Sequence, residues 1–265
     1  MNTAEPLLSS RGITKRFGGV QALSAIDFTI NRGEIYGLIG PNGAGKTSLF
    51  NVLTGIYDTD AGEFTFDGAP LSGLKPHEVA ARGIARTFQN IRLFANLSAL
   101  ENVMIGRHVR THAGVFGAIV RDAKTYAEER AIEKRAYELL AYVGISQRAN
   151  GLAKHLPYGD QRRLEIARAL ATEPKLLALD EPAAGMNATE TARLRGLLED
   201  IRRDGTTILL IEHDMKLVMS VCDRVLVLDY GKKIAEGPAA DVQKDANVIA
   251  AYLGGEVTLN LKGAA

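Results

Sequence analysis

The chain contains no tryptophan, a single cysteine and almost no net charge. Because Cys222 has no second cysteine to pair with, the chain forms no internal disulfide and has no thiolate metal site. The 32 Lys and Arg residues against 31 Asp and Glu residues leave a formal charge of +1. This balance provides no overall field that would attract nucleic acid or anionic lipid, so nucleic acid is not an expected partner.

Long apolar runs are also absent from the sequence. No run approaches the roughly 18 residues that a membrane-spanning helix needs. The start MNTAEPLLSSRG has no basic segment followed by an apolar stretch, so we expect neither a membrane span nor secretion. With 265 residues, 46% of them hydrophobic and 24% charged, the chain has an ordinary globular composition. Glycine is abundant at 27 residues, and its placement needs an explanation.

Short β-branched runs alternate with longer helical stretches, which predicts an α/β fold in which helices cover a parallel sheet. We expect strands at 34–39, 84–88, 175–179, 206–211 and 224–228, and helices at 46–54, 124–143, 161–171, 189–204 and 215–221. Residues 11–30 and 62–67 instead alternate polar and apolar side chains, which is typical of short antiparallel strands and indicates an added β layer. From about residue 96 to residue 156 the pattern is helical.

The glycines concentrate in the segment GLIGPNGAGKTSLF, which matches the pattern G-x-x-x-x-G-K-[ST] between an expected strand and an expected helix. In such a loop, glycines let successive backbone N–H groups point into one concavity, and the next helix directs its positive end at phosphates. Lys46 then reaches the β- and γ-phosphates, and the Thr47 hydroxyl is a suitable ligand for Mg²⁺. The candidate nucleotide-binding residues here are Gly40, Pro41, Asn42, Gly43, Ala44, Gly45, Lys46, Thr47 and Ser48. The alternative is a glycine-rich turn before a helix.

A second motif, KLLALDEP, places two carboxylates at the end of an expected strand. Asp180 is the candidate residue that holds Mg²⁺ through its water shell, and Glu181 is the candidate general base for the attacking water. The alternative is that Asp-Glu-Pro only ends the strand and begins a loop or helix. The phosphate loop in the same chain makes this alternative weaker, because nucleotide hydrolysis needs both motifs.

Beyond these two motifs, the chain resembles the nucleotide-binding subunits of ATP-binding-cassette (ABC) transporters over nearly its whole length. The resemblance includes Gln89 in IARTFQNIRLF, the segment LPYGDQRRLEIARAL at the position of the family signature, and His213 in TTILLIEHD. The resemblance implies the ABC ATPase fold, with a P-loop NTPase core, an antiparallel β layer and a helical subdomain. It further implies that two subunits sandwich two ATP molecules, each bound by the phosphate loop of one subunit and the signature of the other.

The resemblance also implies roles for residues outside the two phosphate motifs. Gln89 would contact the Mg²⁺ shell and the attacking water, although an exposed loop glutamine is the alternative. His213 would contact the γ-phosphate, or else be a hydrogen-bonded core histidine. Phe17 would stack on adenine, or else be a core aromatic. The signature residues that would contact the partner's nucleotide are Tyr158, Gly159 and Asp160.

Two positions depart from the usual family pattern. Pro157 replaces the serine of the signature and has neither a hydroxyl nor a backbone N–H to offer. Asn187 stands where aspartate is frequent. Neither change removes a metal ligand or the candidate base.

Several segments resemble, more specifically, the larger ATP-binding subunit of branched-chain amino-acid importers. They are RFGGVQAL, IARTFQNIRLF, LPYGDQRRLEIARALAT, LDEPAAGMN and VIAAYLG. The resemblance implies a peripheral subunit at the cytoplasmic face of the inner membrane. Its partners would be a second ATP-binding subunit, identical or different, integral permease subunits and, indirectly, a periplasmic solute-binding protein. Other solutes such as urea or amides, a soluble cassette acting on ribosomes or DNA, and an ATP-binding regulator that does not hydrolyse ATP remain alternatives.

The expected organisation has four parts. Residues 1–95 would form the core with the β layer, and residues 96–157 the helical subdomain. Residues 158–254 would form the signature helix and the second half of the core, and residues 255–265 a flexible tail.

Overall fold

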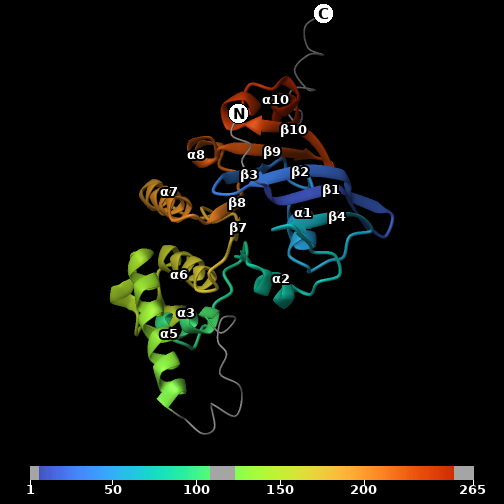
Figure 1. The fold of residues 1–265 in the computed structure, drawn as a ribbon. Helices are drawn as coiled ribbons and strands as arrows, with labels where there is room; N and C mark the ends of the chain where they lie inside the picture. The colour runs from blue at the N-terminus through green and yellow to red at the C-terminus, as the bar shows by residue number, and fades with distance from the viewer. Residues whose placement is uncertain (1–5, 108–122, 254–265) are drawn as a thin grey trace, which may run out of the picture. The chain divides into compact units, whose positions relative to one another are not determined.

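The computed structural model describes residues 6–107 and 123–253 and divides into two compact units (Figure 1). The first, which we call the discontinuous unit, comprises residues 1–79 and 191–265; the second, the central unit, comprises residues 80–190. The expected tail at 255–265 lies outside the described residues. The four-part division expected from the sequence stays a prediction.

The discontinuous unit contains an antiparallel sheet in the order β2-β1-β4-β5. Its strands are β1 (Pro6–Phe17), β2 (Val20–Asn31), β4 (Ala61–Phe66) and β5 (Ala69–Pro70). The register pairs Ser9 with Thr29 and Leu8 with Phe66. The sheet is the expected β layer, but β1 and β2 are each 12 residues long, because bulges shift the register and let the strands continue.

The same unit contains four further strands in the order β10-β9-β3-β8. They are β3 (Ile35–Ile39), β8 (Thr207–Ile211), β9 (Arg224–Asp229) and β10 (Lys232–Pro238). Strand β3 is parallel to β8 and β9, and every residue of β3 and β8 is buried, as expected for apolar strands covered on both faces. Strand β10 pairs antiparallel with β9 and was not predicted, because its sequence KKIAEGP has no alternating apolar pattern.

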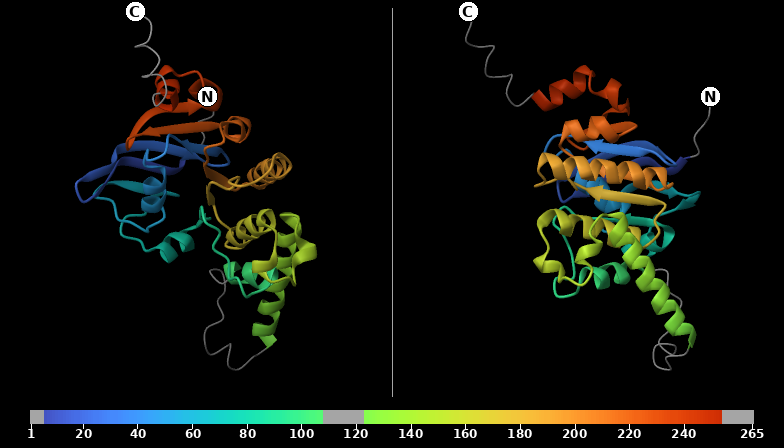
Figure 2. Two further views of the ribbon diagram at one scale, coloured as in Figure 1. Left: turned by 180° about the vertical axis from the view of Figure 1, so that it is seen from behind. Right: turned by 90° about the vertical axis from the view of Figure 1, so that its left-hand side faces the viewer.

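Several of the described helices lie wholly or almost wholly in this unit. They are α1 (Lys46–Leu53), α7 (Ala188–Arg203), α8 (Met215–Val221), α9 (Ala239–Val242) and α10 (Ala246–Leu253). Helix α8 begins after Asp214, whose carboxylate accepts hydrogen bonds from the N–H groups of Lys216 and Leu217. The C-terminal helices α9 and α10, drawn in red, lie against β10 (Figure 2).

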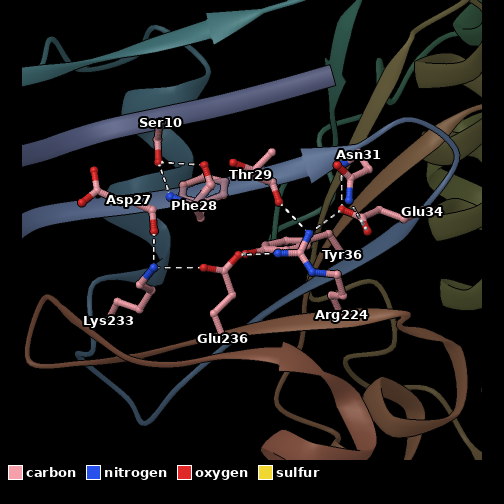
Figure 3. A network of polar contacts seen from close by, with 10 residues as sticks. All are labelled: Ser10, Asp27, Phe28, Thr29, Asn31, Glu34, Tyr36, Arg224, Lys233 and Glu236. Atoms are coloured by element: carbon pink, nitrogen blue, oxygen red, sulfur yellow. Dashed lines mark hydrogen bonds and ion pairs between the residues drawn. The ribbon is translucent and has the colours of Figure 1, made fainter. Parts of the chain in front are cut away.

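A polar network in the discontinuous unit holds β2, β3, β9 and β10 together (Figure 3). Arg224 on β9 donates to the Thr29 carbonyl at 2.9 Å, to Glu34 at 3.2 Å and to Glu236 on β10 at 2.7 Å. The Tyr36 hydroxyl on β3 also donates to Glu236, at 2.7 Å. Burial raises the pKa of Glu34, and burial beside Glu236 raises the pKa of Tyr36. The network therefore fixes β3, the strand that leads into the phosphate loop.

The central unit contains two parallel strands, β6 (Ile84–Arg86) and β7 (Leu176–Asp180). The helices described in it are α3 (Ala99–Arg107), α5 (Ala123–Tyr142) and α6 (Tyr158–Leu170), with short 3₁₀ turns at Ser146–Arg148 and Ala153–His155. The three helices pack together (Figure 2). A side chain at Gly106 of α3 would collide with the Arg168 carbonyl of α6, so glycine permits this close packing.

Most of the expected elements occur within three residues of their predicted bounds. Helix α6 begins at Tyr158 rather than at Gln161, because the N–H groups of Asp160 and Gln161 donate to the Pro157 carbonyl and close the first turn there. Helix α2 (Pro76–Arg82), whose residues span the division between the units, was not predicted because only Val79 is buried in it.

Candidate nucleotide-binding site

The phosphate loop leaves β3 and enters α1 with three glycines in left-handed or similar backbone conformations. Gly40, Gly43 and Gly45 have φ angles of 152°, 81° and 103°. A Cβ at Gly45 would lie 2.7 Å from the Ala22 carbonyl oxygen, and one at Gly40 would collide with the Leu228 carbonyl. Both positions therefore require glycine for space as well as for conformation.

The first turn of α1 has the features of a phosphate-binding helix end. Gly45 is the N-cap residue, no side chain caps the turn, and the turn contains no acidic residue. Lys46 is buried, and its Nζ donates to the carbonyl oxygens of Gly40 at 2.6 Å and Pro41 at 2.9 Å. Its ammonium group is therefore held at the loop, where positive charge and the helix dipole both favour an anion.

Phe17 lies at the end of β1 with 41% of its surface exposed. Its ring contacts Tyr57 edge to face, with the ring centroids 5.2 Å apart, and Lys15 Nζ lies 5.6 Å from its ring centroid. The ring is therefore not a core aromatic, and it remains accessible for stacking on a planar ligand.

His213 follows β8, and its side chain is 61% exposed. Its Nδ1 lies 3.9 Å from Glu212 Oε2, which is too long for a hydrogen bond. Asp214, the other neighbouring acid, caps α8. The exposed imidazole is not a buried core histidine, and its role at a γ-phosphate stays a prediction.

In the central unit, Gln89 and Glu181 meet although 92 positions separate them in the sequence. Gln89 Nε2 donates to Glu181 Oε2 at 2.8 Å. Asp180 ends β7, is buried, and its backbone N–H donates to the Thr87 hydroxyl at 3.3 Å. Glu181 has a φ of 48°, which is unusual for a residue with a side chain and is typical of functional sites.

Arg86 is a charged neighbour of this cluster that sequence reasoning missed. Burial lowers the pKa of Arg86 to about 10, and the carboxylate of Asp180 opposes this shift. The guanidinium carbon of Arg86 lies 4.5 Å from the ring centroid of Phe88. The guanidinium carbon of Arg92 lies 4.4 Å from the same centroid. Arg86 is the last residue of β6, and no sequence motif singled it out.

The signature residues form the start of α6. Tyr158 is 45% exposed, and its ring lies against Gly185, where a Cβ would be 3.3 Å from Tyr158 Cε1. At Gly159 a Cβ would lie 2.7 Å from the Glu190 carboxylate, so a larger residue there would displace the end of the Glu190 side chain. Asp160 is largely buried and forms ion pairs with Arg163 and, at 3.7 Å, with Arg148. Its carboxylate is thus occupied within its own unit, and its contact with a partner's nucleotide stays a prediction.

Tyr252 on α10 is a second residue that sequence reasoning missed. The Gly40 backbone N–H donates to its hydroxyl, while partial burial raises its pKa. The C-terminal helix therefore contacts the phosphate loop within the discontinuous unit.

Each unit contributes a candidate metal ligand, and both are oxygens of the kind that suits Mg²⁺. Throughout residues 6–107 and 123–253, no three His, Cys, Asp or Glu side chains gather as a metal site. Magnesium is usually held by one or two protein oxygens together with water and nucleotide phosphates. Thr47, at the first turn of α1, and Asp180, at the end of β7, supply oxygens of this kind.

Comparison with protein families shows to which family the chain belongs. Residues 23–184, more than half of the chain, match the family model described as "ABC transporter". The chain belongs to the ABC transporter family. Residues 232–258 of this ABC subunit also match the model described as "Branched-chain amino acid ATP-binding cassette transporter".

Curated relatives match this ABC subunit over nearly its full length. It is 44% identical over 253 residues to LivG of Salmonella typhimurium, described as a high-affinity branched-chain amino acid transport ATP-binding protein; the match covers 95% of this chain and 99% of the relative. BraF of Pseudomonas aeruginosa, with the same description, is 41% identical over 252 residues, with the same coverage.

Solved structures confirm the predicted fold class. The ADP conformation of MJ1267, an ATP-binding cassette of an ABC transporter, matches with a TM-score of 0.82 and 31% identity, over 94% of this chain and 99% of that one. The dimeric post-hydrolysis state of the cassette MJ0796, bound to ADP and Pi, matches with a TM-score of 0.75 and 25% identity, over 88% and 98%. The protein is thus an ABC ATPase. Among the described helices, none is long and apolar enough to cross a membrane.

Proposed function

We propose that this ABC ATPase energises a membrane importer for branched-chain amino acids. The observation that carries the proposal is the full-length likeness, 44% identity over 95% of the chain, to a protein described as serving branched-chain amino acid transport. The match at residues 232–258 supports the same group. The identity of the solute rests on the relatives alone, because nothing in the chain contacts the solute itself. Urea or another amide is therefore kept as the alternative solute.

The proposed ATP site assigns the phosphates to the loop and the adenine to Phe17. Residues 40–48 would surround the phosphates with backbone N–H groups, and Lys46 would leave the carbonyls of Gly40 and Pro41 for the β- and γ-phosphates. His213, which is exposed after β8, would contact the γ-phosphate. The exposed ring of Phe17 supports a stacking role.

The proposed hydrolytic residues are Glu181 and Gln89. Glu181 would accept the proton of the attacking water, and Gln89, already 2.8 Å from Glu181, would orient that water. Thr47, Asp180 and Gln89 would hold Mg²⁺, which when bound neutralises phosphate charge. The left-handed backbone of Glu181 supports the proposal because such conformations gather at active sites.

The working form we propose is a dimer of ATP-binding subunits, identical or different, attached to permease subunits at the cytoplasmic face of the membrane. Tyr158, Gly159 and Asp160 of one subunit would face the nucleotide of the other. The exposure of Tyr158 and the dimeric structure of the similar cassette MJ0796 support this arrangement. A periplasmic solute-binding protein would deliver the solute to the permease.

The test is purification of the tagged protein from membranes, followed by reconstitution with the permease subunits that accompany it. We expect leucine, isoleucine or valine, added with the binding protein, to stimulate ATP hydrolysis, and urea to have no effect. Stimulation of ATP hydrolysis by urea and by none of the three amino acids would show that the importer carries urea instead. Recovery only with ribosomes or DNA would overturn the transport function.

A further inference from the structure

The signature helix α6 contains a buried arginine–glutamate pair to which the proposed mechanism assigns no role. Arg162 and Glu165 lie one turn apart, and their side chains are 0% and 1% exposed. Arg162 Nη1 lies 3.0 Å from Glu165 Oε2. A buried ion pair loses the hydration of both charges, so its stability depends on additional hydrogen bonds to the same groups.

Those additional bonds go mainly to the backbone of the Q-loop, which we define as residues 88–92. Arg162 donates to the Phe88 carbonyl at 2.7 Å and to the Gln89 carbonyl at 2.8 Å. Glu165 Oε1 accepts from the N–H groups of Phe88 at 3.4 Å and Arg92 at 3.3 Å. The pair therefore binds donors and acceptors of one short loop from a helix more than 70 positions away.

The same arginine also contacts an exposed residue of the signature. Arg162 Nη2 donates to the Tyr158 hydroxyl at 3.1 Å and to the Gln89 carbonyl at 2.8 Å. Gln89 in turn donates through its side chain to Glu181. One guanidinium group thus contacts both the start of the signature helix and the residue that is bonded to the candidate base.

We propose that Arg162 and Glu165 are positioning residues that hold Gln89 against Glu181 and make the place of Gln89 depend on the signature helix. The proposal rests on the functions proposed above for Gln89 and Glu181. Arginine suits this task because its planar fork can donate to two carbonyls at once, whereas a lysine ammonium on a flexible stem cannot fix two neighbouring peptides in the same way.

The first test is the variant Arg162→Lys, which keeps the positive charge beside Glu165 and removes the fork. We expect the turnover number to fall by about 10-fold or more, because a misplacement of about 1 Å in a catalytic arrangement costs on the order of 10²-fold. The dissociation constant for Mg·ATP, measured by equilibrium dialysis, should change by a much smaller factor than the turnover number, because the phosphate loop with Lys46 is untouched and Gln89 is only one of the proposed Mg²⁺ ligands. Wild-type turnover of a folded Arg162→Lys protein would overturn the proposal.

The matched control is Arg135→Lys on α5. Arg135 pairs with Glu138 at 3.1 Å in the same i,i+3 spacing, but both side chains are exposed. This variant should keep wild-type turnover. A loss of turnover equal to that of Arg162→Lys would show that the effect is not specific to the Q-loop and would overturn the proposal.

A double-mutant cycle with Gln89→Ala separates positioning from general structural support. If Arg162 acts through Gln89, Arg162→Lys should lower turnover in the wild-type background and have no further effect in the Gln89→Ala background. If Arg162→Lys lowers turnover by the same factor in both backgrounds, Arg162 does not act through Gln89 and the positioning role is overturned. The role proposed for Gln89 itself would not be affected by that result. Wild-type turnover of Gln89→Ala itself would overturn the proposed role of Gln89, and with it the catalytic consequence of the pair.

A second variant covers the case in which Arg162→Lys does not fold. Glu165→Gln keeps the size of the side chain but replaces one carboxylate oxygen by a donor, so one of its Q-loop or arginine contacts is lost. We expect the same lowered turnover, the same much smaller change in the affinity for Mg·ATP, and the same absence of any further effect in the Gln89→Ala background. Full turnover of folded Glu165→Gln would overturn the proposal.

Discussion

The side-chain amide of Gln89 donates a hydrogen bond of 2.8 Å to the carboxylate of Glu181. Glu181 holds this position with a φ of 48°, a backbone conformation that strains a residue with a Cβ by about 1–2 kcal/mol. An amide can donate to a carboxylate and accept from water at the same time. This geometry suits the roles that we propose, Glu181 as the base and Gln89 as the group that orients the attacking water.

The variant Glu181→Gln tests this arrangement. Glutamine keeps the shape of the side chain but cannot accept a proton, so we expect hydrolysis to fall by about 10²–10⁴-fold while ATP still binds. Phosphate release and equilibrium dialysis with Mg·ATP measure the two quantities. The control Glu138→Gln changes an exposed glutamate on α5 and should be inert. Wild-type turnover in Glu181→Gln would remove Glu181 from the role of base.

The variant Lys46→Ala tests the phosphate loop. The Lys46 ammonium is held by the carbonyls of Gly40 and Pro41, so its loss removes the positive charge at the loop without changing the glycine backbone. We expect weaker binding of Mg·ATP by roughly 10-fold or more, as for hydrogen bonds to charged groups. Lys244→Ala, an exposed lysine after α9, is the control. Equal affinity of Lys46→Ala and the wild type would contradict the assignment of the loop.

The interior strands of the fold could be predicted closely from sequence. Strands β3, β7 and β8 are mostly apolar and buried at every residue, and buried runs of this kind leave little freedom in their bounds. Strand β10 could not be predicted, because its residues are mostly half-exposed and its pairing with β9 depends on the turn at Tyr230 and Gly231.

Some features of the candidate site could also be predicted from the sequence, and others could not. The phosphate loop and Asp180 follow local patterns, because their chemistry requires neighbouring residues. The bonds from Arg162 to the Q-loop join residues 73 and 74 positions apart, and only the folded chain brings them together. The ion pair of Asp160 with Arg148 was likewise not visible in the sequence, because Arg148 lies outside the signature.

The variant Phe17→Ala tests adenine stacking. Removing the exposed ring should weaken ATP binding by about 1–3 kcal/mol, as estimated from base stacking on aromatic rings, and leave the turnover number at saturating ATP almost unchanged. Binding of inorganic triphosphate, which has no base, should not change. Val20→Ala in the same hairpin, at a residue 68% exposed, is the control. An unaltered ATP affinity would show that the ring does not contact adenine.

The buried thiol of Cys222 makes stability depend on pH above the neutral range. Burial, with smaller effects from Asp223 and Glu212, raises the pKa of Cys222 to about 12. In the unfolded chain the thiol has a pKa of about 8.5. Below about pH 8.5 the thiol is protonated in both the folded and the unfolded state, so Cys222 does not make the free energy of unfolding depend on pH. Between the two pKa values only the unfolded state loses the proton, so the free energy of unfolding falls as pH rises.

We expect this effect to reach about 2 kcal/mol at pH 10, from roughly 1.4 kcal/mol per pH unit above the unfolded pKa. Urea unfolding of the wild type and of Cys222→Ala at pH 8 and pH 10 isolates it, because lysines and tyrosines that also titrate are common to both proteins. The wild type should lose more stability than the variant between the two pH values. An equal loss would show that Cys222 is not protonated in the folded protein at pH 10. Rapid reaction of the native protein with dithionitrobenzoate at pH 8 would contradict the burial directly, because only an accessible thiolate attacks the reagent.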